Sequence, residues 1–301
     1  MVSLNLNHLE PNPGFKITPG LAVKGLYGLV FGDIFMRVLY RMRPYEREAG
    51  SADRLHAKWL KICQDFVSQK HVSHKRFVQI CRDIIKDFDR LPIHEDLKKP
   101  RVGVVGEILV KFSPSANNHL VELLEHEGAE AVVPDLMDFL LYCFKNSEFK
   151  ADHLGKKRSG ARVARAGIQA MEWLRKPAAK AFTESVHFNA PGNIDEMADM
   201  ASDIVSVGNQ TGEGWFLTAE MLELIHEDVP NIVCTQPFGC LPNHVVGKGV
   251  IKELRRRYPT SNVVAIDYDP GASEVNQLNR LKLMLSTANK HLKAEQNSSP
   301  N

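Results

Sequence analysis

The sequence predicts an α/β protein whose core is a doubly wound parallel sheet with additional helices. Three observations lead to this fold class: short apolar runs, helical stretches that alternate with them, and turn residues at or just after the end of each run. Runs this short and apolar are typical of strands that a parallel sheet buries on both faces. The four candidate strands are residues 101–106, 131–133, 231–235 and 262–266.

The first candidate strand opens a βαβ unit. After residues 101–106 comes Ser115, whose side chain can cap a helix that carries Leu120 on its apolar face. Gly128 is expected to end this helix, because glycine readily adopts the left-handed conformation found at helix C-termini. Residues 131–133 then form the second strand.

Residues 1–100 are interpreted as a partial N-terminal helical segment of a larger fold. One amphipathic helix is predicted to begin at Ser51 and another to cover residues 75–88, because apolar side chains recur there at helical spacing. Cys63 and Cys81 fall within these two helices. Both are expected to be core thiols rather than ligands.

Residues 101–290 are expected to form one α/β lobe that carries a helical insertion at about 135–206. The remaining residues, 291–301, are polar and are predicted to be a disordered tail. Beyond the insertion, the predicted helices are residues 215–226, 243–258 and 273–287.

The composition narrows the class of function. The chain has 301 residues, of which 44% are hydrophobic and 25% charged, as in an ordinary globular protein. A formal net charge of +2 gives no reason to expect a nucleic-acid or membrane partner. The N-terminus lacks the pattern of a secretory signal, and charged residues and glycines interrupt the apolar stretch 21–40. We therefore expect a cytoplasmic protein.

The loop that follows the third strand carries the strongest chemical signal. It reads Cys234-Thr-Gln-Pro-Phe-Gly-Cys240, in a chain with five cysteines and no Cys-x-x-Cys pair. Open α/β sheets bind ligands at the carboxyl ends of their strands, and a helix starting at Asn243 would direct free N–H groups toward a thiolate. We interpret Cys240 as an iron–sulfur ligand, with Cys234 as a second candidate. The alternative is two half-buried thiols in a rigid turn.

Three other side chains are candidates for a role in the site. His244 can act as a ligand, acid or base, or as a hydrogen-bonded helix cap. Glu107 follows the first strand, where a carboxylate can orient a substrate or cap a nearby turn. Cys143 belongs to an apolar helical stripe at 139–143, which favours a core position over a ligand.

Two polar segments are open to more than one interpretation. Residues 208–214 contain three glycines and can cradle a phosphate. They lack the Lys-Ser/Thr pair of a Walker loop and follow a helix, so independent ATP hydrolysis is not expected. The segment Asp267-Tyr-Asp-Pro-Gly271 can bind a metal or a polar substrate through its carboxylates, or form an ordinary turn.

Two longer motifs give the chain a resemblance to a known family. They are Gln236-Pro-Phe-Gly-Cys-Leu-Pro-Asn-His244 and Ala265-Ile-Asp-Tyr-Asp-Pro-Gly-Ala-Ser-Glu274. On these residues the chain resembles the 2-hydroxyacyl-CoA dehydratases and their activators, specifically the dehydratase-like part of acyl-CoA dehydratase activase-related proteins. The resemblance extends from about Gly25 to Ser286. Further matching runs are Arg43–Glu46, Val102–Phe112, Ala116–Asn118, Gly128–Tyr142 and Gly212–Trp215.

The resemblance implies a protein with a four-iron, four-sulfur (4Fe-4S) cluster held between two α/β lobes. In that family an ATP-hydrolysing activator donates one electron to the cluster, which passes it to a 2-hydroxyacyl-CoA thioester. The ketyl radical that results can lose water. Cluster cysteines come from both lobes, and Cys240 best matches the ligand from the second lobe. Cys234 and Cys143 are the remaining candidate metal ligands.

This chain departs from the family, because it lacks the activator ATPase domain and the first, cysteine-bearing lobe. We therefore expect an iron–sulfur redox module that depends on an ATP-dependent activator and on a chain or lobe supplying further cysteines. It would act on acyl-CoA-type substrates, with Glu107 and His244 as catalytic candidates. The alternative is a non-catalytic binding or assembly module without a cluster, left by a truncated or split gene.

Overall fold

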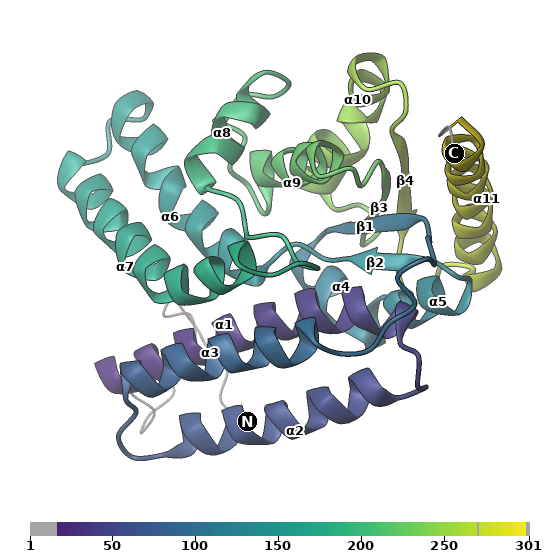
Figure 1. Ribbon diagram of the computed structural model, residues 1–301. Coiled ribbons are helices and arrows are strands. Elements are labelled where there is room, and N and C mark those ends of the chain that lie inside the picture. Colours follow the sequence, from purple (N-terminus) through teal and green to yellow (C-terminus); the bar gives the residue numbers. More distant parts are fainter. Residues whose placement is uncertain (1–16, 270, 299–301) are drawn as a thin grey trace.

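A four-stranded parallel sheet lies at the centre of the protein (Figure 1), as the alternating sequence pattern predicts. The computed structural model describes residues 17–298 apart from residue 270. The spatial order of the strands is β2-β1-β3-β4, and each adjacent pair runs parallel. The strands are β1 Arg101–Gly106, β2 Glu130–Val132, β3 Asn231–Gln236 and β4 Asn262–Asp267. The fold is therefore α/β and doubly wound.

The strand order places a topological switch point between β1 and β3. From β1 the chain moves outward to β2, and from β3 it moves outward in the opposite direction to β4. At this point Gly106 pairs with Thr235. Gly106 has a φ of +136°, and a Cβ atom on it would lie 1.9 Å from the carbonyl oxygen of Thr235. Only glycine fits this close approach of two backbones.

Helices cover both faces of the sheet. On one face, α5 (Leu120–His126) and α11 (Glu274–Ser298) pack with the strands into one apolar cluster. On the other face, α9 (Gly214–His226) and α10 (Ile251–Arg257) form a second cluster, seen above the sheet in Figure 1. The two connections that leave the switch point therefore use opposite faces of the sheet, the arrangement in which open α/β proteins bind ligands at the carboxyl ends of the central strands.

The remaining helices form one layer beside the sheet, and this layer was not predicted. The N-terminal helices and the helices of the 135–206 insertion share a single apolar cluster, which also takes in Trp215 of α9. In Figure 1, α1 and α3 run side by side beneath the sheet, and α6 and α7 lie next to each other. The members are α1 Pro19–Met42, α2 Ser51–Ser68, α3 His74–Asp89, α6 Leu136–His153, α7 Arg158–Thr183 and α8 Ile194–Ser202.

The helix predicted after Ser115 is present as α5 and ends just before Gly128, as predicted, but it begins only at Leu120. A short α4 (Ile108–Phe112) directly follows β1. Ser115 does not cap α5: the N–H of Leu120 donates instead to the side-chain oxygen of Asn117 at 3.0 Å. Between them, Asn118 has a φ of +52°, which no right-handed helix can contain.

The helix predicted from Asn243 begins as a π-helix over Asn243–Gly247 and becomes α10 only at Ile251. Thr218 donates a hydrogen bond of 2.7 Å to the carbonyl oxygen of Val246, which satisfies a group that the irregular turn leaves free. Short π-helical segments are frequent at functional sites. The irregularity lies directly after the cysteine loop.

At the C-terminus, α11 continues to Ser298, so residues 291–298 are helical where the sequence predicts disorder. Residues 299–301 of the predicted tail lie outside the described residues. A search of the described helices for one with the length and apolar character needed to cross a membrane finds none.

Candidate functional site

The Cys240 loop lies at the switch point of the sheet, beyond the carboxyl end of β3. It joins the carboxyl end of β3 to the π-helix, and Cys240 itself is half-buried. Its neighbours Phe238 and Leu241 are 77% and 70% exposed. The thiol is therefore reachable from solvent, at the position where open α/β sheets bind their ligands.

A buried amide holds the sulfur of Cys240. Asn243 is fully buried, and its Nδ2 donates to the Cys240 Sγ at 3.0 Å and to the Glu213 Oε2 at 3.1 Å. Glu213 in turn accepts a hydrogen bond of 3.3 Å from the Ile108 N–H, at the turn after β1. The sulfur of Cys240 is thus fixed in place by a buried amide at the switch point of the sheet.

His244 is tied to the same loop. Its Nδ1 lies 2.8 Å from the carbonyl oxygen of Cys240, and its backbone N–H donates to that oxygen at 3.1 Å. Because a carbonyl can only accept, Nδ1 carries the hydrogen in this contact. His244 is therefore oriented by the Cys240 loop and does not cap the helix.

Glu107 directly follows β1 and caps α4. One of its carboxylate oxygens accepts a hydrogen bond of 2.8 Å from the Val110 N–H. Burial raises the pKa of Glu213, and the nearby negative charge of Glu107 raises it further. Glu107, Glu213 and Cys240 thus lie around the carboxyl ends of β1 and β3, with Glu213 as the link between them.

Cys234 is not part of this accessible surface. Its side chain is fully buried in the apolar cluster between the sheet and α9, and Gly247 of the π-helix packs over its Sγ. Burial raises the pKa of its thiol to about 12, with nearby carboxylates adding to the rise. A thiol held neutral in an apolar core is a poor metal ligand.

Cys143 is exposed on α6, so the core position favoured by its apolar stripe is wrong. The hydroxyl of Tyr142 donates to the Gly212 carbonyl oxygen at 2.9 Å, and Pro242 lies close to the other side of Gly212. The glycine-rich loop therefore stands between the helix that carries Cys143 and the loop that carries Cys240. The 208–214 loop therefore supports the Cys240 loop, a role that the sequence did not suggest.

These residues do not form a complete metal site. Within residues 17–298 other than 270, no group of three or more His, Cys, Asp or Glu side chains lies close enough together to hold a metal ion. Iron–sulfur clusters are held by several cysteine thiolates. Cys240 is suited to be one ligand, but this chain does not supply the rest of a cluster.

The sequence did not predict a buried ion pair between Lys111 and Glu220. The Nζ of Lys111 lies 2.5 Å from the Oε1 of Glu220, and the two side chains are 0% and 1% exposed. Burial raises the pKa of Glu220 to about 7, against the opposing pull of Lys111. Lys111 and Glu220 each interrupt an otherwise apolar run, and this interruption is the sequence signal by which the pair could have been found.

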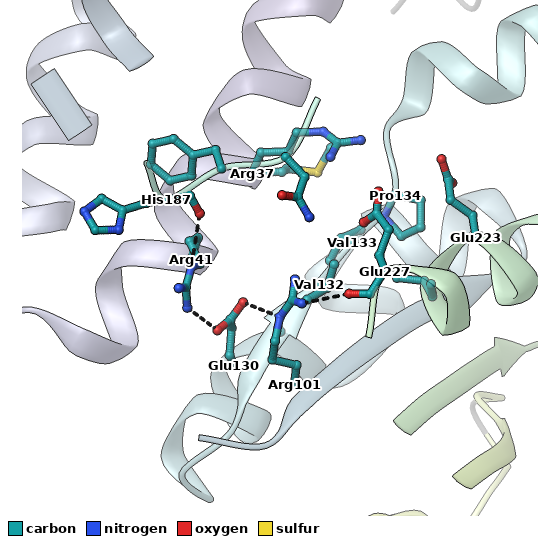
Figure 2. Close-up of a pocket in the computed structure, with 15 residues that line it drawn as sticks. Arg37, Arg41, Arg101, Glu130, Val132, Val133, Pro134, His187, Glu223 and Glu227 are labelled. Carbon is teal, nitrogen blue, oxygen red and sulfur yellow. Dashed lines mark hydrogen bonds and ion pairs between the residues drawn. The ribbon is translucent and has the colours of Figure 1, made fainter. Parts of the chain in front are cut away.

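A second charged region lies at the joint between the helical layer and the sheet (Figure 2). Glu130 of β2 accepts hydrogen bonds from Arg41 at 2.6 Å and from Arg101 at 3.1 Å. These groups line a small hollow of about 70 Å³. Glu223 and Glu227 of the α9 end also line it, and Glu223 forms no ion pair with a described residue.

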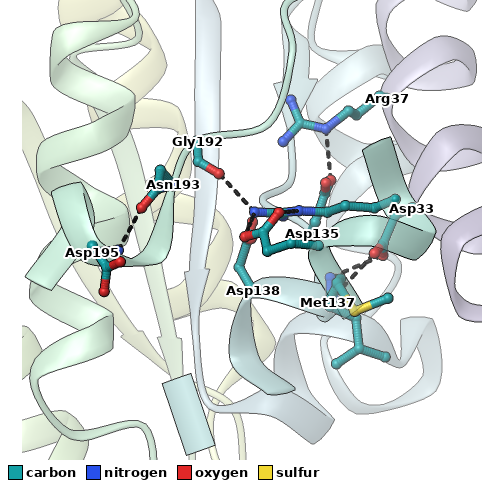
Figure 3. A network of polar contacts seen from close by, with 11 residues as sticks. Asp33, Arg37, Asp135, Met137, Asp138, Gly192, Asn193 and Asp195 are labelled. Atoms are coloured by element: carbon teal, nitrogen blue, oxygen red, sulfur yellow. Dashed lines mark hydrogen bonds and ion pairs between the residues drawn. The ribbon is translucent and has the colours of Figure 1, made fainter. Parts of the chain in front are cut away.

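The same joint continues into a buried network at the start of α6 (Figure 3). Asp33 accepts hydrogen bonds from the backbone N–H groups of Leu136 and Met137, at 2.9 and 3.0 Å. Arg37 pairs with Asp135 at 2.7 Å. A carboxylate at a helix N-terminus satisfies N–H groups that the helix itself leaves free. Helix α1 is thereby fixed to α6.

Glu223 should make stability depend on pH. Burial raises its pKa to about 8, and the charge of Asp138 adds to that rise. The folded state favours the protonated carboxyl, so Glu223 contributes fully to stability below the pKa that it has in the unfolded chain. This contribution is lost as the pH rises through about 8. Between pH 5 and 8, ionisation of Glu223 should lower the free energy of unfolding of the wild type by up to about 1.4 kcal/mol per pH unit. Glu223→Gln should remove this part of the pH dependence.

Urea unfolding at a series of pH values measures this slope. Glu253→Gln is the matched control, since Arg256 and Arg257 lower the pKa of Glu253 to about 2, outside the window. Identical slopes in the wild type and in Glu223→Gln would contradict the role given to Glu223.

Comparisons with models of known protein families, with curated proteins and with solved structures find no match. The fold and site therefore define the class of the protein by themselves. It is a doubly wound α/β protein with a half-exposed cysteine at its topological switch point.

Proposed function

We propose that this chain is one half of a composite iron–sulfur redox site. Cys240 contributes one thiolate, and a partner chain or lobe contributes the other cysteines of a 4Fe-4S cluster. An ATP-dependent activator would supply the electron, and acyl-CoA-type molecules are the proposed substrates. The observation that carries this proposal is the hydrogen bond from the buried Asn243 amide to the half-exposed Cys240 Sγ.

The surface around Cys240 supports contact with a partner. Phe238, Leu241 and Val245 are 77%, 70% and 51% exposed, and they lie within one stretch of eight residues along the loop and π-helix. Exposed apolar side chains gathered around a polar group are typical of protein interaction sites. A partner seated there would also remove water from the thiol.

The roles of the chain's own residues follow from their contacts. Asn243 holds the sulfur, and Glu213 fixes the amide of Asn243 in the orientation that donates to it. His244 is oriented by the carbonyl oxygen of Cys240. Glu107 adds a negative charge near Glu213.

A binding or assembly module without a cluster is the second candidate function. The same exposed apolar side chains favour it, since they can dock a partner without any chemistry at Cys240. The two candidates differ in one respect. Replacing Cys240 should abolish iron binding under the first and leave partner binding unchanged under the second.

Anaerobic reconstitution of the full chain with iron and sulfide tests the first candidate. A small-molecule thiol in excess, or the product of the adjacent upstream reading frame, would supply the missing thiolates. We expect bound iron and visible absorption in the wild type and their loss in Cys240→Ser. Cys143→Ser, at the other exposed thiol, is the matched control and should keep both. Equal iron content in Cys240→Ser and the wild type would contradict the assignment.

A further inference from the structure

A second cavity, of about 440 Å³, lies at the carboxyl ends of β3 and β4. Its volume is in the range of sites for small molecules. It shares Phe238 with the Cys240 loop, and the first turns of α11 form its other wall. The charged and aromatic residues that line it are Phe238, Asp267, Asp269 and Arg280.

Asp267 is held by buried amides on two sides. Gln236 donates to its Oδ1 at 2.6 Å, and Gln277 donates to its backbone carbonyl at 2.8 Å. Gln277 is held in turn by Asn118, whose Nδ2 donates at 2.9 Å from a residue with a φ of +52°. A simple turn does not require such support, whereas a preorganised binding group does. Backbone strain of this kind often accompanies function.

Charges of both signs face this cavity without neutralising each other. Asp267, Asp269 and Arg280 all line it. Yet Arg280 forms no ion pair within the part of the chain that the structure describes. A dianionic phosphate would meet two carboxylates and only one guanidinium, so the balance of charge disfavours it. A ligand with one positive and one negative group suits both sides.

We propose that this cavity binds a zwitterionic α-amino acid with an apolar side chain. The ammonium group contacts Asp267 and Asp269, and the carboxylate contacts Arg280, whose planar guanidinium matches a carboxylate in shape. The N-terminus of the 25-residue helix α11 adds a favourable field for the carboxylate. Phe238 and Ile266 face the apolar side chain. This inference is independent of the iron–sulfur proposal.

Isothermal titration calorimetry on the full chain without iron tests the proposal, with L-phenylalanine as the probe. We expect saturable binding, weakened by at least about tenfold when the carboxylate is missing, in L-phenylalaninamide, or the ammonium, in 3-phenylpropionate. Arg280→Ala should weaken L-phenylalanine to a similar degree and leave the amide unaffected. Asp267→Asn should weaken L-phenylalanine and leave 3-phenylpropionate unaffected.

Arg162→Ala, at an exposed arginine on α7, is the matched control and should bind L-phenylalanine like the wild type. Circular dichroism would establish that each variant is folded. The absence of binding by L-phenylalanine and by other apolar amino acids at millimolar concentration would overturn the proposal. So would tighter binding of inorganic phosphate or AMP through Arg280, or an equal effect of Arg280→Ala on the acid and its amide.

Discussion

Gly106→Ala is expected to prevent the chain from reaching its native fold. The new methyl group would lie 1.9 Å from the Thr235 carbonyl oxygen, at the point where β1 and β3 pair in the middle of the sheet. The clash is with backbone, so no side chain can turn away to relieve it. The φ of +136° adds a conformational penalty for any residue with a Cβ. We expect a loss of more than about 4 kcal/mol, which is in the range that unfolds an ordinary domain.

Gly128→Ala is the matched control. Gly128 also has a positive φ, +85°, but nothing lies within 4 Å of the position that its Cβ would take. Its replacement should cost only about 1 kcal/mol, the conformational term alone. Yield of soluble protein and urea unfolding followed by circular dichroism measure both variants. Equal stability of the two would show that β1 and β3 do not approach as closely as described.

Lys111→Met is expected to cost about 3–5 kcal/mol, because it leaves Glu220 buried without a partner. The side chain of methionine matches the length of lysine, so the loss reflects charge rather than a cavity. The destabilisation should be larger at pH 8 than at pH 5. In acid, Glu220 can take up a proton, since its pKa is already raised to about 7 by burial.

The double variant Lys111→Met with Glu220→Leu distinguishes this explanation from a packing defect. Replacing both members of a buried pair by apolar residues is often close to neutral, so most of the lost stability should return. Equilibrium urea unfolding of the two single variants and the double variant forms the cycle. A double variant as unstable as Lys111→Met would show that the loss does not come from an uncompensated carboxylate.

The strands could be predicted because their signal is local. Residues 102–106 and 232–234 are buried on both faces, and their short apolar runs are the direct result. The doubly wound class followed from their alternation with helices. The helical layer could not be predicted in the same way, because α1–α3 and α6–α7 meet only through contacts between residues far apart in the chain. The apolar face of a helix does not specify which other helix it packs against.

The start of α5 and the π-helical start at Asn243 depend on local features that single-residue propensities do not show. Ser115 is a good capping residue, but the left-handed backbone at Asn118 delays the helix to Leu120, whose N–H donates to the side chain of Asn117. At Asn243, packing of Gly247 against Leu217 accompanies a π-helical first turn. Neither outcome follows from the order of residues in the segment itself.

The candidate site was predicted in outline and missed in its detail. The position of Cys240 after a central strand was enough to mark it as a ligand candidate. Its support was not visible, because Glu213 reaches Asn243 from a loop about thirty residues earlier in the chain. Cys234 was a second candidate on spacing alone, and the structure places its thiol in the apolar core. Cys234 is buried, whereas Cys240, six positions later, is half-buried.

Helix α1 has a consequence for cooperativity. Phe31 and Val38 belong to the core of the helical layer, whereas Met36 packs against the cluster beneath the sheet. Arg37 and Arg41 tie the same helix to Asp135 and Glu130. Because one helix belongs to two cores, neither core can open without disturbing the other, and the two form a single cooperative unit. A cut at Pro100 would therefore not release an autonomous domain, despite the change in sequence pattern there.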